Sequence, residues 1–451
     1  MYKLLFFPML MWSAVFVNKP DFVKFEDIQA HSLTIRWNDT SDNEQGFKIF
    51  RDKKLIYITK ENVTSYTDEG LSADTNYSYT IKATNISRHK LLPPKADGKI
   101  YFGAESGYEE DTKNTSEISN KISDFDTKSQ KPTMWAYIAD NWSYWDERGE
   151  EPYPKNVVQA ILERDKKVVF MRMVPYKNIK YVSPMDVAKA KTCKIDKKCI
   201  DDTYKLHDIA TSASIEAMIR DWARGAKRHF EEAKADGKPF YLLIDFCPEM
   251  NGYWFPWSDL HQSANDYKEA YRKFVDIFRQ EKVPHVTWVF HPDLTNEIEW
   301  NWLGSLSDFP NHTRWAKPAS YYPGDDYVDW IGFSRYGKDD ELSDIDDYPS
   351  FSSKMDQFDL LIKSLNATKP IMIAEIAVTE NPYDPNAKKV WFEEMFTDIK
   401  SRPRIKAFSY WNESWGTETN IGTSTTSLKA FSDGVKDSVF VNEPNISFVG
   451  E

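Results

Sequence analysis

The sequence predicts an α/β fold in which a (β/α)8 barrel follows a smaller all-β sandwich. In the larger, C-terminal part of the chain, apolar runs typical of buried strands alternate with amphipathic helical stretches. The later strands recur about every 35 to 45 residues, which is the length of one β/α unit. In the N-terminal part, short alternating runs are separated by turn-forming clusters, as in a β-sandwich. With 451 residues, the chain is long enough for both domains.

Residues 1–19 are expected to form a secretory signal peptide. A short basic start precedes an apolar run from Leu4 to Val17, which is shorter than a comfortable membrane span. We expect cleavage between Ala14 and Pro20, and therefore a protein that is secreted, extracellular, periplasmic or anchored at a surface. An uncleaved N-terminal anchor is the alternative, and no later segment is apolar enough to cross a membrane.

Residues 22–124 are expected to form the sandwich. Ser32–Trp37 and Gly46–Arg51 alternate in polarity, and the polar cluster between them predicts a turn. This region resembles a fibronectin type III domain, because Trp37 lies where that family has its core tryptophan and Tyr77 where it has its corner tyrosine.

The same resemblance implies a last strand at Ser116–Ile122 and an enlarged loop at residues 86–115 before it. A loop of this length is usually functional or disordered. We expect an additional hairpin near Lys99–Phe102 within this loop.

Residues 131–440 are expected to form the barrel. The apolar runs that predict its strands are Thr133–Ala139, Val168–Val174, Phe240–Phe246, Val286–His291, Val328–Phe333, Pro370–Ala374 and Ile405–Trp411. Helices are expected at Ala213–Ala235 and Asn265–Gln280. An eighth strand, third in barrel order, is expected in the Lys-rich stretch of residues 176–212.

Composition limits the classes of partner. A net charge of −12 argues against nucleic acids and anionic membrane surfaces. The 16 Trp residues are compatible with carbohydrate binding, although large cores also use Trp. Cys193 and Cys199 predict a local disulfide in an oxidising compartment, whereas Cys247 is expected to be a buried thiol. No metal-ligand spacing is present, and we expect neither a metal nor a cofactor.

Two carboxylates lie where a barrel places its catalytic residues, at the C-terminal ends of strands. Glu249 follows the fourth expected strand and Glu375 the seventh, so the two side chains should face each other across the barrel mouth. Carboxylates about 5 Å apart suit a retaining glycosidase, with one as acid/base and the other as nucleophile. Their mutual repulsion would keep one protonated while the other is ionised.

The residues around Glu249 fit a sugar-binding site. The Asn251 amide can bind a ring hydroxyl, and the indoles of Trp254 and Trp257 can stack on a pyranose. Core packing is the alternative for both indoles, and we expect one of them to pack inward.

Further candidates for sugar binding follow other strands. They are His291, Tyr336, Trp411 and Trp142. His291 is equally consistent with a sugar ligand and with a hydrogen-bonded histidine at a strand end. For Trp411, packing in the core is the alternative to a sugar-stacking platform. Trp142 could line a distal subsite, and a position facing the sandwich is its equally plausible alternative.

Residues 131–440 resemble glycoside hydrolase family 26, a family of β-mannanase-type retaining barrels. The resemblance depends on four segments in order, Glu249–Trp257, Asp329–Tyr336, Lys369–Glu375 and Phe408–Asn412. It implies Glu249 as acid/base, Glu375 as nucleophile, Tyr336 as its support and Trp411 as a sugar-stacking residue. It also implies a polysaccharide substrate, with β-1,4-mannan as the leading expectation and lichenan, β-1,3-xylan or an exopolysaccharide as alternatives.

Two residues depart from the pattern of that family. Pro248 occupies the place of a His that contacts the sugar, and Asp245 occupies the place of an Arg that orders the site. If Asp245 points into the barrel, its charge should raise the pKa of Glu249 or of another neighbour. A non-catalytic glycan-binding or adhesion protein on a degenerate barrel is therefore the rival hypothesis.

Overall fold

The structure of the protein is a computed structural model. It describes residues 19–41, 44, 46–59, 62–84, 89–107, 114–145, 152–177, 203–252, 255–258, 261–294, 318–337, 348–365, 368–413 and 418–448. The chain divides into two compact units, Met1–Arg88 with Phe448–Glu451, and His89–Ser447. The predicted signal peptide at residues 1–19 lies almost entirely outside the described residues, as does the predicted Cys193–Cys199 disulfide.

The N-terminal unit contains two antiparallel sheets. One has the strand order β1-β2-β5 and the other β4-β3-β6. The bounds are β1 Asp21–Glu26, β2 Ser32–Asn38, β3 Gly46–Arg51, β4 Lys54–Ile58, β5 Ser65–Glu69 and β6 Tyr79–Thr84. The apolar residues of alternating positions form its buried core, namely Ile35, Trp37, Phe47, Ile49 and Ile81. These sheets confirm an all-β sandwich.

Tyr77 lies at a corner of this unit. Its hydroxyl accepts a hydrogen bond from the backbone N–H of Ser72 at 3.0 Å, which ties the chain before β6 to the turn after β5. A corner tyrosine of this kind is a feature of several sandwich families. The narrower assignment to fibronectin type III stays a prediction.

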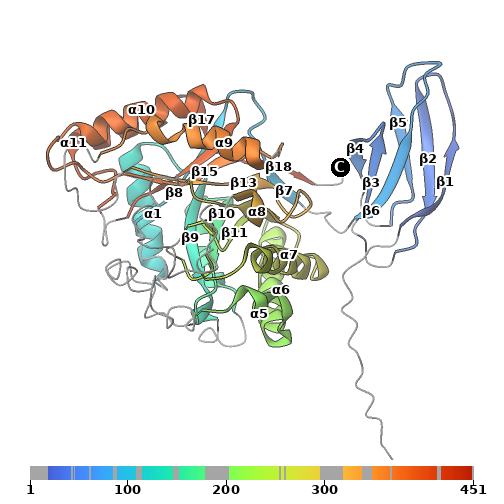
Figure 1. The fold of residues 1–451 in the computed structure, drawn as a ribbon, viewed down its shortest axis with the longest axis horizontal. Coiled ribbons are helices and arrows are strands. Elements are labelled where there is room, and N and C mark those ends of the chain that lie inside the picture. The colour runs from blue at the N-terminus through green and yellow to red at the C-terminus, as the bar shows by residue number, and fades with distance from the viewer. Residues whose placement is uncertain are drawn as a thin grey trace, which may run out of the picture. The chain divides into compact units, whose positions relative to one another are not determined.

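The second unit is a closed barrel of parallel strands (Figure 1). Among the described residues it has eight strands, the sixth being split into two short pieces. In chain order they are β8 Ile100–Glu105, β9 Trp135–Asn141, β10 Val168–Val174, β11 Tyr241–Phe246, β12 Val286–Phe290, β13 Trp330–Ile331 with β14 Ser334–Tyr336, β15 Ile371–Ala377 and β16 Ile405–Trp411. The barrel closes where β16 pairs with β8 and where β13 pairs with both β12 and β15.

Helices surround the strands on the outside of the barrel (Figure 1). They are α1 Thr115–Ser129, α2 Lys155–Leu162, α5 Leu206–Thr211, α6 Ala213–Ala235, α7 Ala264–Gln280, α8 Pro318–Tyr321, α9 Asp356–Leu365, α10 Ala387–Ser401 and α11 Thr425–Val435. Short 3-10 turns lie at Trp142–Tyr144 and Ser352–Lys354. Three short strands complete the unit, β7 His89–Leu92, β17 Phe440–Val441 and β18 Asn445–Phe448.

The predicted barrel is confirmed, and each of its seven predicted strands overlaps an observed one. The strand that was missing is the first and not the third. It is β8, Ile100–Glu105, inside the stretch that was expected to be an enlarged sandwich loop with a hairpin. The described part of residues 176–212 contributes the helix α5 and an isolated bridge between Tyr176 and Thr203.

The predicted last sandwich strand, Ser116–Ile122, is also wrong. This segment is part of α1, whose buried side includes Ile118, Ile122 and Phe125. A spacing of four and three residues places these side chains on one helical face, whereas strand pairing would put Ile118 and Ile122 on one face and Phe125 on the other. The domain boundary therefore lies near residue 88 and not within residues 124–131.

Gly103 explains how β8 fits beside its neighbour. A Cβ atom at this position would lie 2.0 Å from Nε1 of Trp135, a contact that no side chain can make. The glycine leaves space for the buried indole, which donates to the hydroxyl of Ser409 on β16 at 3.2 Å. Within the described residues, no helix is long and apolar enough to span a membrane.

Candidate active site

Glu249 and Glu375 occupy the C-terminal ends of two barrel strands. Glu249 lies in the turn that follows β11, and Glu375 lies in the second half of β15, paired in register with Ser334 of β14. The two residues are 6% and 3% exposed, so both carboxyl groups are taken out of bulk water. Their strand ends face the barrel mouth, as the sequence predicts.

The turn that carries Glu249 has an unusual backbone. Cys247 and Glu249 have φ values of 50° and 54°, a region that residues other than glycine rarely occupy. Pro248 lies between them, and its carbonyl accepts the Nε1–H of Trp257 at 2.8 Å. The Glu249 N–H donates to the carbonyl of His291 at 2.6 Å. The acid side chain is therefore presented by a backbone that its surroundings hold in place.

Two hydroxyl groups and a cation lie against the carboxyl group of Glu375. The Tyr336 hydroxyl donates to Oε2 at 2.7 Å, and the Tyr137 hydroxyl lies 3.0 Å from Oε1. The guanidinium of Arg172, on β10, lies 3.6 Å from the same Oε1. An ionised carboxylate with donors on both oxygens is the form that a nucleophile requires.

Glu249 is in a different electrostatic state. Burial raises the pKa of its carboxyl group, and the charge of Glu375 raises it further. The Ser334 hydroxyl, which donates to Glu249 Oε1, and the cations of His291 and Arg172 oppose this shift without cancelling it. Of the two glutamates, Glu249 is therefore the one suited to hold a proton.

Asp245 points into the barrel and is fully buried. Its Oδ2 atom lies 2.5 Å from Nδ1 of His291 and 3.0 Å from the hydroxyl of Tyr137. Burial alone would lower the pKa of His291, but the Asp245 carboxylate outweighs it and raises that pKa to about 9. The predicted effect of Asp245 on the pKa of a neighbour is therefore seen at His291, and the imidazole of His291 is a cation.

His291 is thus a hydrogen-bonded histidine at a strand end, which was one of the two interpretations of this residue from the sequence. Both ring nitrogens have partners, Asp245 on Nδ1 and the Ser334 hydroxyl on Nε2 at 2.8 Å. The predicted direct contact with a sugar stays a prediction.

Aromatic rings close one side of the site. Trp411, which is 5% exposed, donates its Nε1–H to Glu413 at 2.6 Å and meets the Tyr137 ring edge to face. The Arg172 guanidinium lies over the rings of Trp411 and Phe255, at 5.7 and 4.9 Å from their centroids. Trp411 therefore packs against Tyr137 and Arg172, the residues that contact Glu375. Its predicted role in sugar stacking stays a prediction.

Two candidate indoles are buried. Trp257 packs inward, as expected for one indole of its segment, whereas Trp142 does not form the predicted platform. Trp142 is 1% exposed and is stacked between Trp145 and Phe274, with centroids 4.5 and 6.0 Å away. Trp257 is fully buried and stacks on Phe255. Both rings fill the core because their flat faces are already covered. Trp254 lies outside the described residues.

Asn251 holds a neighbouring loop. Its amide donates to the carbonyl of Asp293 at 2.9 Å and accepts from the Asp293 N–H at 2.8 Å. This pair of bonds fixes the turn after β11 to the segment after β12. The predicted contact between Asn251 and a sugar hydroxyl stays a prediction.

The sequence did not single out Arg172, Tyr137 or Ser334 as site residues. Arg172 had a visible signal, since it is the one charged residue in the apolar strand β10, Val168–Val174. Tyr137 and Ser334 had none, because a phenol or hydroxyl within a strand is common and its partners come from other strands.

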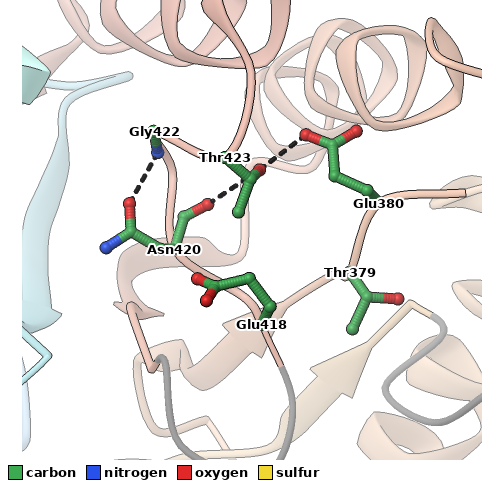
Figure 2. A pocket seen from close by; sticks show the side chains of 6 residues that line it. All are labelled: Thr379, Glu380, Glu418, Asn420, Gly422 and Thr423. Carbon is green, nitrogen blue, oxygen red and sulfur yellow. Dashed lines mark hydrogen bonds between the residues drawn. The ribbon is translucent and has the colours of Figure 1, made fainter.

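A polar pocket of about 490 Å³ lies beside the ends of β15 and β16 (Figure 2). Its lining residues are Thr379, Glu380, Glu418, Asn420, Gly422 and Thr423. The Thr423 hydroxyl bonds to Glu380 at 2.5 Å, and the Gly422 N–H donates to the Asn420 side chain at 2.7 Å. Carboxylate, amide and hydroxyl groups of this kind suit a hydroxyl-bearing ligand.

The fold and the carboxylate pair define a barrel of the glycoside hydrolase class. Residues 185–415 match the family model described as Glycosyl hydrolase family 26. The chain belongs to this family.

Similar proteins agree with this assignment. Endoglucanase H of Acetivibrio thermocellus is 29% identical over 213 residues, which are 46% of this chain and 21% of that protein. Mannan endo-1,4-beta-mannosidase of Bacillus subtilis is 26% identical over 237 residues, which are 50% of this chain and 52% of that protein. The chain therefore spans about half or less of the length of these relatives.

Solved structures share the fold. The catalytic domain of the GH26 endo-β-1,4-mannanase of Bacillus sp. JAMB-750 aligns with a TM-score of 0.52 at 16% sequence identity. The alignment covers 76% of this chain and 87% of that one.

Proposed function

We propose that this protein is a retaining endo-glycosidase that hydrolyses a β-linked polysaccharide, with β-1,4-mannan as the substrate. The observation that carries the proposal is the different surroundings of two buried carboxyl groups. Glu375 receives donors on both oxygens, whereas burial and the charge of Glu375 raise the pKa of Glu249. A retaining mechanism needs one group of each kind.

The proposed reaction has two steps. In the first, the Glu375 carboxylate attacks the anomeric carbon while Glu249 gives its proton to the departing glycosidic oxygen, so that a glycosyl ester forms. In the second, ionised Glu249 takes a proton from water, the water oxygen attacks the anomeric carbon and Glu375 leaves. The enzyme returns to its starting protonation state.

Mannan is supported by a relative named Mannan endo-1,4-beta-mannosidase, from Bacillus subtilis. A β-glucan is the second candidate, because another relative is named Endoglucanase H. The apolar run at residues 4–17 supports secretion, which N-terminal sequencing of the mature protein would test.

Hydrolysis of a panel of β-glycans tests the proposal. We expect the wild type to release oligosaccharides from β-1,4-mannan, and Glu375→Gln to reduce the rate by at least about four orders of magnitude. A wild type that cuts none of the glycans, with binding that survives Glu375→Gln, would instead support the rival glycan-binding protein.

A further inference from the structure

A chain of hydrogen bonds leads from Asp245 to Glu249. Asp245 Oδ2 lies 2.5 Å from His291 Nδ1, His291 Nε2 lies 2.8 Å from Ser334 Oγ, and the Ser334 hydroxyl donates to Glu249 Oε1. Asp245 belongs to β11, His291 directly follows β12 and Ser334 begins β14. Three consecutive strands of the barrel therefore build the chain, and all four side chains are buried.

The charge of His291 sets the direction of donation along this chain. Because the ring is a cation, both of its nitrogens carry protons, one donated to Asp245 and the other to Ser334 Oγ. The single hydroxyl proton of Ser334 is then directed to Glu249. On a neutral ring protonated at Nδ1, the Nε2 lone pair would attract that hydroxyl proton away from Glu249.

Charge balance at the site favours the protonated form of Glu249. The charged and titratable groups that act on Glu249 directly are Arg172 of β10, His291 after β12, Tyr336 of β14 and Glu375 of β15. Asp245 of β11 and Tyr137 of β9 contact these groups in turn. When Glu249 is protonated, the charges of two carboxylates are balanced by those of Arg172 and His291. Ionisation of Glu249 would add an uncompensated buried charge.

We infer that Asp245, His291 and Ser334 act together as positioning residues, which orient the carboxyl group of Glu249 and set the pH range over which it is protonated. The inference rests on the proposed role of Glu249 as the acid/base. The Asp245–His291 ion pair sets the direction in which the hydrogen bonds are donated. The Ser334 hydroxyl donates the last of them to Oε1 of Glu249.

A pH profile of kcat/KM tests the last bond of the chain. The Ser334 hydroxyl lowers the pKa of Glu249, so Ser334→Ala should raise it and move the basic limb of the profile upward by about one pH unit. The value of kcat/KM at the optimum should fall about tenfold, because the acid is no longer held. Ser334→Thr keeps the hydroxyl and should restore the wild-type basic limb, which a merely structural role would not require.

Histidine NMR tests the first bond independently of activity. In the wild type, the imidazole of His291 should stay doubly protonated at pH 7.5 and titrate near 9. In Asp245→Asn it should titrate below about 7, its unperturbed range. His285, whose pKa is lowered to about 4 by burial, serves as an internal reference in the same spectrum.

The two measurements separate the inference from the proposed function. A wild type without hydrolytic activity would overturn the acid/base role while the titration of His291 is still measured. If the wild type is active, a basic limb of its pH profile that is unchanged in Ser334→Ala would overturn the inferred positioning role. A wild-type His291 that is neutral at pH 7.5 would do the same. Both variants are first checked for native thermal unfolding, and the titration of wild-type His291 stands even if a variant fails to fold.

Discussion

Two phenol hydroxyls lie within hydrogen-bond distance of Glu375, and the hydrogen bond from Tyr336 joins neighbouring strand ends at 2.7 Å. Tyr336→Phe removes this donor from a buried carboxylate and leaves the ring in place. We expect kcat/KM to fall about 10- to 100-fold, the size of a hydrogen bond to a charged group. Steady-state kinetics on the cleaved glycan measure the effect.

The matched control is Tyr322→Phe. The Tyr322 hydroxyl bonds to exposed Asp325 at 2.7 Å and lies outside the candidate site. Its removal should leave kcat/KM near the wild-type value. Equal activities of Tyr336→Phe and Tyr322→Phe would contradict the assigned role of Tyr336.

The Asp245–His291 pair also makes stability depend on pH. The pKa of His291 is raised to about 9, so its contribution is fully present below about 6.5 and is lost as pH rises through 9. The free energy of unfolding of the wild type should exceed that of Asp245→Asn at pH 6, by less than the shift of His291 alone would give, because burial raises the pKa of Asp245. This difference should shrink between pH 6.5 and 9.5 in urea titrations, and a difference that is constant over this range would argue against a charged pair.

At the residue scale, the sequence predicted the glutamates but not their partners. Glu249 and Glu375 follow apolar strands, and that position is visible along the chain. The partners Tyr137 and Arg172 reach Glu375 across distances of more than 200 residues in sequence. The wrong assignment of Trp142 has a related cause, since a sequence does not show whether both faces of an indole are covered. For the same reason it did not show which of Trp254 and Trp257 packs inward.

At the scale of elements, β8 shows that an apolar pattern does not reveal which strands a segment pairs with. Ile100–Glu105 is short, contains a glycine and precedes a polar segment, so it fits a hairpin as well as a barrel strand. Its partners β9 and β16 identify it, and the pairing with β16 joins residues about 300 positions apart. The α1 segment was recognisable from the helical spacing of Ile118, Ile122 and Phe125, which the resemblance to a sandwich family obscured.

Substitution of Gly103 tests the position of β8 in the barrel. Gly103→Ala puts a Cβ atom 2.0 Å from the Trp135 indole, and we expect it to lower the free energy of unfolding of the barrel by about 3 kcal/mol. Gly98→Ala is the control, because a Cβ there meets nothing within 4 Å and the cost of its φ of +72° is only about 1 kcal/mol. Urea unfolding followed by tryptophan fluorescence compares the two. Similar losses for both variants would show that the close packing of β8 on Trp135 is incorrect.

At the scale of the whole molecule, the unit boundary near residue 88 makes a prediction about truncation. A chain that starts at His89 keeps all eight barrel strands and should unfold cooperatively. A chain that starts at Lys131 lacks β8 and α1, which leaves the barrel open between β9 and β16, and it should not unfold cooperatively. Calorimetry of the two fragments checks this, and a stable fragment from Lys131 would show that β8 is dispensable.

In the proposed mechanism, Glu375 forms a covalent intermediate while Glu249 acts as acid and then as base. It predicts that the product keeps the β configuration of the cleaved bond. Proton NMR during the first minutes of mannan oligosaccharide hydrolysis measures this directly, before mutarotation mixes the anomers. We expect the β anomer to appear first with the wild type, and a first product with the α configuration would rule out the proposed retaining mechanism.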